Sequence, residues 1–103
     1  MTGRTSSNGN AIIATAGAHQ TVLGGGQDAF LVKITSSGVR QRGTYYGGSG
    51  GDRGNSCVTD ASGNVYMAGF TTSSLAGTLI ATAGAHQPAY GGGTYDAFLV
   101  KFN

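Results

Sequence analysis

The stretch Thr15-Ala16-Gly17-Ala18-His19-Gln20 returns unchanged as residues 82–87, 67 positions later in the chain. A second stretch, Asp28-Ala29-Phe30-Leu31-Val32-Lys33, returns as residues 96–101. In both copies a run of three glycines lies between the two stretches. Self-similarity at a fixed spacing is the sequence signature of a repeat architecture. The chain therefore holds about one and a half copies of a unit of just under seventy residues.

The composition narrows the class of protein. The chain has 103 residues, 20 of them Gly, with 1 Pro, 10% charged residues and a net charge of +2. This weak charge excludes charge-driven disorder, and glycines without a period of three exclude collagen. No apolar run reaches the length of a membrane-spanning helix, and abundant Gly without any Glu disfavours a helical bundle. We therefore expect a β-rich, turn-rich chain of one domain at most.

Alternation of apolar and other residues predicts the strands of each unit. In residues 28–34, Phe30 and Val32 share one face and are expected to be buried, as are their copies Phe98 and Val100. Lys33 and Lys101 are expected to reach solvent. The strands expected from such patterns are residues 28–34, 39–46, 56–60, 64–71 and 96–102, with a partial copy of 64–71 at Met1-Thr2-Gly3. The other stretches, residues 5–27, 47–55 and 71–95, are expected to be glycine-rich loops or connections.

Four short antiparallel strands per repeat are typical of a β-propeller blade. Along this chain the expected strands are the second, third and fourth of one blade, followed by the first, second and third of the next. The predicted fold is thus all-β, with a partial blade in residues 1–46 and a second blade in residues 47–103 that lacks its outer strand.

One set of residues resembles a known family. It comprises Thr44-Tyr45-Tyr46-Gly47-Gly48-Ser49-Gly50-Gly51-Asp52, Gly54-Asn55-Ser56, Val58, Asp60, Ser62-Gly63-Asn64-Val65-Tyr66, Gly69 and Thr71, and it continues through residues 82–85 and 91–93 to residues 96–98. In this order they resemble the bacterial SBBP repeat of seven-bladed β-propellers, and the resemblance extends over nearly the whole chain. It implies tandem blades in a secreted or cell-surface protein, and hence an extracellular or cell-surface location, although no signal peptide opens this chain. The resemblance implies no catalytic residues.

Two features depart from the family pattern. Arg42 stands where the family usually carries a large aromatic residue, and His19 and His86 stand where an aromatic residue usually follows the Ala-Gly-Ala sequence. These changes are expected to loosen packing between blades or to alter a surface.

Candidate metal ligands are few. A zinc site needs three or four converging ligands, whereas each unit supplies a single histidine, His19 or His86. Residues 60–64 resemble the first half of a calcium loop, but no Glu exists to complete it. Asp60 and Gly63 suit an ordinary turn, in which the carboxylate accepts backbone N–H groups and the glycine takes a positive φ. We therefore expect no metal and no cofactor.

Candidate catalytic groups are also weak. Asp28, Asp52 and Asp96 could pair for glycosidase chemistry only if the fold held two carboxylates at a suitable separation, which the spacing does not require. The simpler role for these residues is to cap loop backbone or to pair with Lys33, Lys101 or Arg53. The glycine runs of the chain lack the Lys-Ser/Thr of a phosphate-binding loop. We therefore expect the protein not to be an enzyme.

A ligand-binding surface is a separate hypothesis. Tyrosines in polar loops can stack on sugars, although they also pack between sheets. The candidate surface for a carbohydrate comprises Tyr45, Tyr46, Tyr90, Tyr95, His19 and His86. Nucleic acid is not an expected partner, because the basic residues are scattered and form no stripe.

The function expected first is structural. Blade sheets bury their faces against neighbouring blades, so an isolated pair would leave two apolar faces and open edges in water. We expect a non-enzymatic repeat subunit that self-associates through blade-on-blade packing, closing into a ring or extending as an extracellular filament or scaffold. The alternatives are a lectin-like propeller that binds carbohydrate through its long loops, and a fragment of a longer secreted propeller protein.

Overall fold

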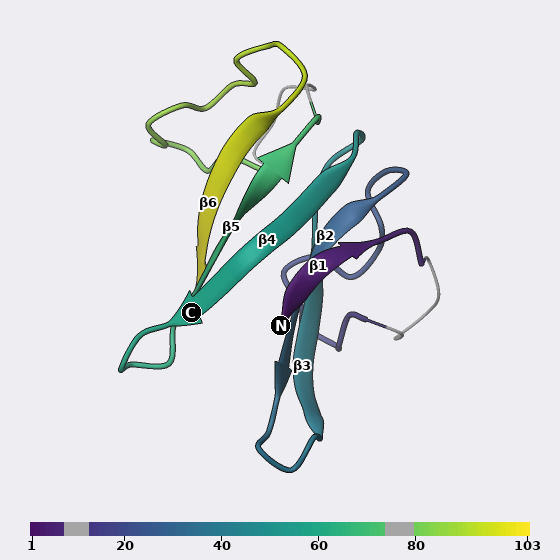
Figure 1. The fold of residues 1–103 in the computed structure, drawn as a ribbon, viewed down its shortest axis with the longest axis vertical. Coiled ribbons are helices and arrows are strands. Elements are labelled where there is room, and N and C mark those ends of the chain that lie inside the picture. Colours follow the sequence, from purple (N-terminus) through teal and green to yellow (C-terminus); the bar gives the residue numbers. More distant parts are fainter. Residues whose placement is uncertain (8–12, 74–79) are drawn as a thin grey trace.

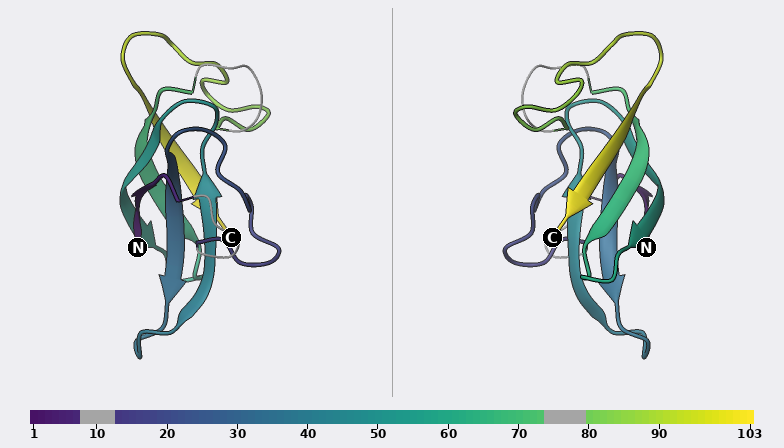
Figure 2. Two further views of the ribbon diagram at one scale, coloured as in Figure 1. Left: turned by 90° about the vertical axis from the view of Figure 1, so that its right-hand side faces the viewer. Right: turned by 90° about the vertical axis from the view of Figure 1, so that its left-hand side faces the viewer.

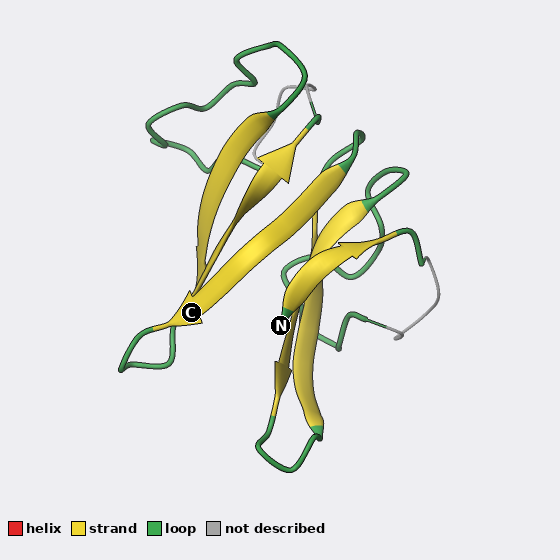
Figure 3. Cartoon of the chain, viewed as in Figure 1, coloured by secondary structure: helices red, strands yellow, loops and turns green. Residues whose placement is uncertain are grey.

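The computed structural model describes residues 1–7, 13–73 and 80–103, and these contain six strands and no helix. The strands are β1 (Thr2–Thr5), β2 (Asp28–Ile34), β3 (Arg40–Tyr46), β4 (Asp52–Thr59), β5 (Val65–Thr71) and β6 (Asp96–Phe102). All pair antiparallel in two three-stranded sheets, of order β1-β2-β3 and β4-β5-β6 (Figures 1 and 3). The predicted all-β class is confirmed.

The strand boundaries follow the alternation pattern closely, with one correction. β2 and β6 have the predicted bounds, and β3 and β5 each begin one residue later than predicted. β4, however, begins at Asp52, within the stretch predicted as a glycine-rich connection. It extends so far because residues 52–54 pair with residues 69–71 of β5, and a bulge between Gly54 and Ser56 absorbs the irregular register. A glycine-rich stretch is typical of a loop, but glycines can also pair with a neighbouring strand and become part of a sheet.

The two sheets form layers that pack face to face (Figure 2). The core between them joins side chains from both sheets, namely Ala29, Leu31 and Tyr46 from the first and Val65, Met67 and Phe98 from the second. Thr2 links the layers as well, since its hydroxyl lies 2.6 Å from the Phe30 carbonyl oxygen and 2.8 Å from the sulfur of Met67. The packing of the sheets therefore brings together residues far apart in the sequence.

The predicted alternation holds in part in β6, where Phe98 is buried and Leu99 and Lys101 are exposed, but Val100 is only half-buried. In β2 both faces are covered, so Leu31 and Val32 are both buried, whereas Phe30, which was predicted to be buried, is only half-buried. The second sheet covers the face that carries Leu31. Ile13 approaches the opposite face, where a Cβ added to Gly43 would overlap the Ile13 carbonyl oxygen.

The turn between β4 and β5 has the predicted mechanism. The Asp60 carboxylate accepts hydrogen bonds from the backbone N–H groups of Ser62 (2.9 Å) and Asn64 (3.0 Å). Gly63 adopts a φ of 83°, which is open to glycine without steric cost. The Asn64 side-chain amide also donates to the Asp60 carboxylate (2.8 Å). This bond above all, together with the backbone bonds, lowers the pKa of Asp60 below its ordinary value.

Candidate functional site

A carboxylate closes the glycine-rich loop in each repeat unit. In the first unit, Asp28 Oδ2 accepts hydrogen bonds from Gln20 Nε2 (2.6 Å) and from the Gly24 backbone N–H (2.7 Å). In the second unit, Asp96 Oδ2 accepts the equivalent bonds from Gln87 Nε2 (3.0 Å) and from the Gly91 backbone N–H. The predicted capping role of Asp28 and Asp96 is confirmed, and the same loop is built twice.

A strand lies beside this loop in the first unit. β3 pairs with β2 along one edge. Along its other edge, β3 bonds to the loop: the Thr15 N–H donates to the Gly43 carbonyl oxygen (3.0 Å), and the Tyr45 N–H donates to the Gln20 carbonyl oxygen (3.1 Å). β3 is therefore held between a strand and a preformed loop.

The same place in the second unit is a cavity of about 680 Å³. The residues that line it include Thr82, Ala85, Gln87, Asp96, Leu99 and Val100. Within the described parts of the chain, β6 is the last strand of its sheet and pairs only with β5. This difference between the units agrees with the sequence, in which residues 80–87 repeat residues 13–20 while the second unit was expected to lack its outer strand, the copy of residues 40–46.

Two carboxylates meet beneath Gly47. Asp28 and Asp52 are 0% and 1% exposed, and a Cβ built on Gly47 would lie 2.7 Å from Asp28 Oδ1 and 2.7 Å from Asp52 Oδ2. Asp52 accepts hydrogen bonds from the Gly48 N–H (2.9 Å) and from the Ser73 hydroxyl (2.9 Å to Oδ2). Among the described residues, Asp28 Oδ1 has no hydrogen-bond partner.

The electrostatics of this carboxylate pair follow from burial. Burial raises the pKa of Asp28 above its ordinary value, and the nearby Asp52 charge adds to this effect. Burial also raises the pKa of Tyr46 to about 12, with a further contribution from Asp52. The structure thus brings together Asp28 and Asp52, while Asp96 belongs to the loop of the second unit. The pair is closed to a substrate, and its oxygens bond to loop backbone and hydroxyl groups instead.

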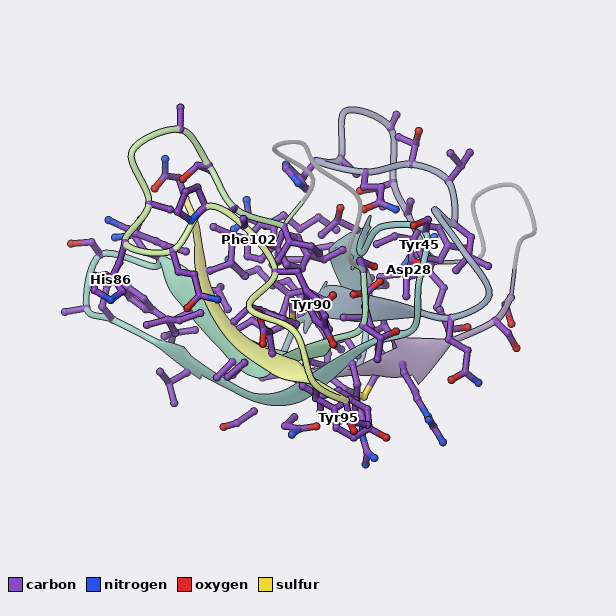
Figure 4. The ribbon with its side chains drawn as sticks, turned by 90° about the horizontal axis from the view of Figure 1, so that it is seen from above. Asp28, Tyr45, His86, Tyr90, Tyr95 and Phe102 are labelled. Atoms are coloured by element: carbon purple, nitrogen blue, oxygen red, sulfur yellow. The ribbon has the colours of Figure 1, made fainter. Side chains whose placement is uncertain are left out.

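The residues of the candidate carbohydrate surface do not gather on one face. Tyr45 and Tyr46 are 1% and 2% exposed, and their hydroxyls donate to the carbonyl oxygens of Ser7 (2.7 Å) and Ile80. Figure 4 shows Tyr45 and His86 on opposite sides of the molecule.

The remaining candidates divide between the two units. The His19 ring lies 5.8 Å from the Tyr46 ring. In the second unit, the Tyr95 ring is exposed and packs at 4.5 Å against Phe70, and the Tyr90 hydroxyl donates to the Gly93 carbonyl oxygen (3.0 Å). His86 is exposed and lines the 680 Å³ cavity. The carbohydrate hypothesis stays a prediction.

Two further features bear on partners and cofactors. In residues 1–7, 13–73 and 80–103, no three His, Cys, Asp or Glu side chains cluster in a way that would hold a metal ion. These same residues include no helix with the length and hydropathy needed to cross a membrane.

Comparison of the chain with family models, with curated proteins and with solved structures found no match.

Proposed function

We propose that this protein is a non-enzymatic structural module that associates head to tail with further copies of the same repeat. One observation carries the proposal. Leu31 and Leu99 occupy equivalent positions of the two units, yet Leu31 is 9% exposed and Leu99 is 75% exposed. The face of the first sheet that carries Leu31 is buried against the second sheet. The equivalent face of the second sheet, which carries Leu99, is exposed.

The partner surface recurs as well. Phe98 of the second sheet contributes to the core, and its copy in the first sheet is Phe30, on the face turned away from the second sheet. The two phenylalanines have the same local setting, because a Cβ on Gly3 would lie 2.9 Å from the Phe30 ring and one on Gly69 would lie 2.8 Å from the Phe98 ring. The two sides of the internal contact are thus repeated on opposite faces of the molecule.

Such an arrangement favours a heterologous contact, in which the Leu99 face of one copy packs on the Phe30 face of the next. Contacts of this kind close into rings or extend into filaments, depending on the rotation that they impose. Burial of a side chain the size of leucine contributes about 1.5–3 kcal/mol, and Ala97 would be covered with Leu99 just as Ala29 is covered with Leu31.

The resemblance to SBBP repeats supports this proposal, since it would make the contact a packing of β-propeller blades outside the cell. Further repeats on the same polypeptide would use the same two faces. The protein would then be part of a longer propeller, and its role would remain structural.

The test measures the mass of the protein in solution by light scattering, with two variants. Leu99→Lys places a charge on the face proposed to be covered, whereas Val22→Lys alters a comparably exposed apolar residue on a loop. We expect the unmodified chain and Val22→Lys to form oligomers at tens of micromolar, and Leu99→Lys to lose them. A cooperatively unfolding monomer of the unmodified chain at that concentration would overturn the proposal.

A further inference from the structure

We propose that the cavity between β6 and residues 80–90 is a binding groove for an extended strand of the pattern Gly-Thr-Tyr-Tyr-Gly, supplied by another copy of the repeat. The groove lies at the edge of β6, so its occupation does not depend on the packing of sheet faces proposed above. The first unit contains an equivalent groove, which β3 fills.

The filled groove has two sides. β2 supplies one side through the β2–β3 ladder. Residues 15–20 supply the other, where the Gly43 N–H donates to Thr15 Oγ1 (3.2 Å) and the Gln20 N–H donates to Thr44 Oγ1 (2.9 Å). Gly43 and Tyr45 also make two backbone bonds to this loop. The strand thus contributes main-chain groups and the Thr44 hydroxyl, and the loop contributes main-chain groups and the Thr15 hydroxyl.

Both sides exist in the second unit. β6 repeats β2, and residues 80–87 repeat residues 13–20 without a change. The loop also has the same conformation, since Ala18 and Ala85 donate to the carbonyl oxygens of Thr15 and Thr82 at 3.1 Å in both cases. Gly17 and Gly84 take φ values of 76° and 79°. The loop is therefore preformed around a cavity and does not need a bound strand to take its shape.

The geometry of the filled groove defines the occupant. A Cβ on Gly43 would overlap the Ile13 carbonyl oxygen and lie 3.3 Å from Val32 Cγ2, and a Cβ on Gly47 would collide with Asp28. The second unit has Ile80, Val100 and Asp96 at the equivalent positions. Glycine is thus required at both ends of the bound segment.

The centre of the segment has its own requirement. Thr44 exchanges hydrogen bonds with Gln20, for which Gln87 is the copy. Addition of a strand to an open sheet edge derives affinity from main-chain bonds and specificity from such side-chain positions. The occupant is therefore a segment like residues 43–47, supplied by a further repeat, because residues 43–47 of this chain already fill the groove of their own unit.

The test uses the full chain and a synthetic peptide of residues 40–50 that carries a fluorophore at its N-terminus. Binding is followed by anisotropy and by amide chemical shifts of the protein. We expect saturable binding, with shifts concentrated in residues 82–87 and 96–101. A matched peptide with Gly43→Val is expected to bind at least tenfold more weakly, because its side chain would meet the Ile80 carbonyl group.

Two protein variants test the groove itself. Thr82→Val removes the hydroxyl equivalent to that of Thr15 and is expected to weaken binding about threefold to tenfold, the effect of losing one or two hydrogen bonds. Thr94→Val, at an exposed position between the glycine run and β6, is expected to leave binding unchanged. Equal affinity for both peptides, no binding at about 1 mM peptide, or shifts centred elsewhere would overturn the inference.

The two proposals fail separately. Ala68→Lys, on the exposed face of β5 and opposite Leu99, disfavours packing of sheet faces without altering the groove. Peptide binding by this variant as a monomer would support the groove whatever the oligomeric state of the unmodified chain. Loss of peptide binding in a protein that still oligomerises would overturn the groove alone.

Discussion

Asp28 of β2 and Asp52 of β4 each place one carboxylate oxygen beside Gly47, since a Cβ built on this glycine would lie 2.7 Å from both oxygens. Asp28 is the first residue of β2 in the first sheet, and Asp52 is the first residue of β4 in the second sheet, so the pair lies where the two sheets meet. Both carboxylates are buried and accept hydrogen bonds from the backbone of glycine-rich segments, so the pair holds these segments in place.

The pair gives the protein a specific dependence on pH. The folded pKa of Asp28 lies above its ordinary value of 3.8, because burial and the Asp52 charge disfavour ionisation. The folded state therefore binds this proton more tightly than the unfolded state does. The contribution of Asp28 to stability is full below the ordinary pKa and is lost as the pH rises through the folded pKa.

Asp28→Asn should remove that loss. Asn keeps an acceptor for Gln20 and Gly24, and its amide can donate toward Asp52. We expect a gain of about 1 kcal/mol at pH 7, the size of one net hydrogen bond, and a smaller gain near pH 4. Urea unfolding of both proteins across this pH range measures the difference. Parallel stability curves would contradict the assignment.

Gly47 should tolerate no side chain. Gly47→Ala would place Cβ 2.6 Å from Asp28 Cγ, and overpacking of this kind costs about 1–3 kcal/mol. Gly26→Ala is the matched control, because a Cβ there meets no atom within 4 Å. Thermal unfolding of the two variants should show a clear loss for the first and little change for the second. Equal stability of the two would mean that the carboxylates do not crowd Gly47.

Asp60 should show the opposite pH dependence to Asp28. Hydrogen bonds, chiefly from the Asn64 side chain, lower its folded pKa, so its contribution to stability is present above the ordinary Asp pKa and is lost as the pH falls through the folded value. Asp60→Ala is expected to lower the melting temperature at pH 7 and to have less effect in acid. A pH-independent decrease would indicate that the carboxylate charge does not matter to the turn.

The register of β6 predicts unequal costs for two adjacent residues. Phe98 is buried in the core and Leu99 is exposed. Phe98→Ala is expected to cost about 3–5 kcal/mol, whereas Leu99→Ala at the same protein concentration should cost less than about 0.5 kcal/mol in the monomer. Denaturant unfolding distinguishes them. A cost for Phe98→Ala below about 1 kcal/mol would place the strand out of register by one residue.

Much of the fold could be predicted from the sequence, because its strands carry a local signal. The bounds of β2 and β6 follow from alternation over seven residues, and the turn at Asp60 follows from the preferences of Asp and Gly. The early start of β4 could not be predicted in the same way. Asp52 and Gly54 join the strand only because β5 offers them a pairing edge.

The candidate sites depended far more on tertiary structure. The sequence alone indicated that Asp28 and Asp96 would cap loops, but it did not place Asp28 beside Asp52, nor Tyr45 and Tyr46 in the interior. The edge of β6 that is unpaired among the described residues agrees with the prediction that the second unit lacks its outer strand, the copy of residues 40–46. The existence of the groove as an open cavity required the structure.

The sequence by itself determined the repeat, the strands and the residue types on each face. Only the tertiary structure decided which copy of each face is covered. Leu31 and Leu99 lie in identical hexapeptides, and the first is buried while the second is exposed. Local sequence sets the direction of a side chain in a strand, whereas burial depends on a second sheet that packs against that face. Within residues 1–7, 13–73 and 80–103, such a sheet covers this face in only one of the two units.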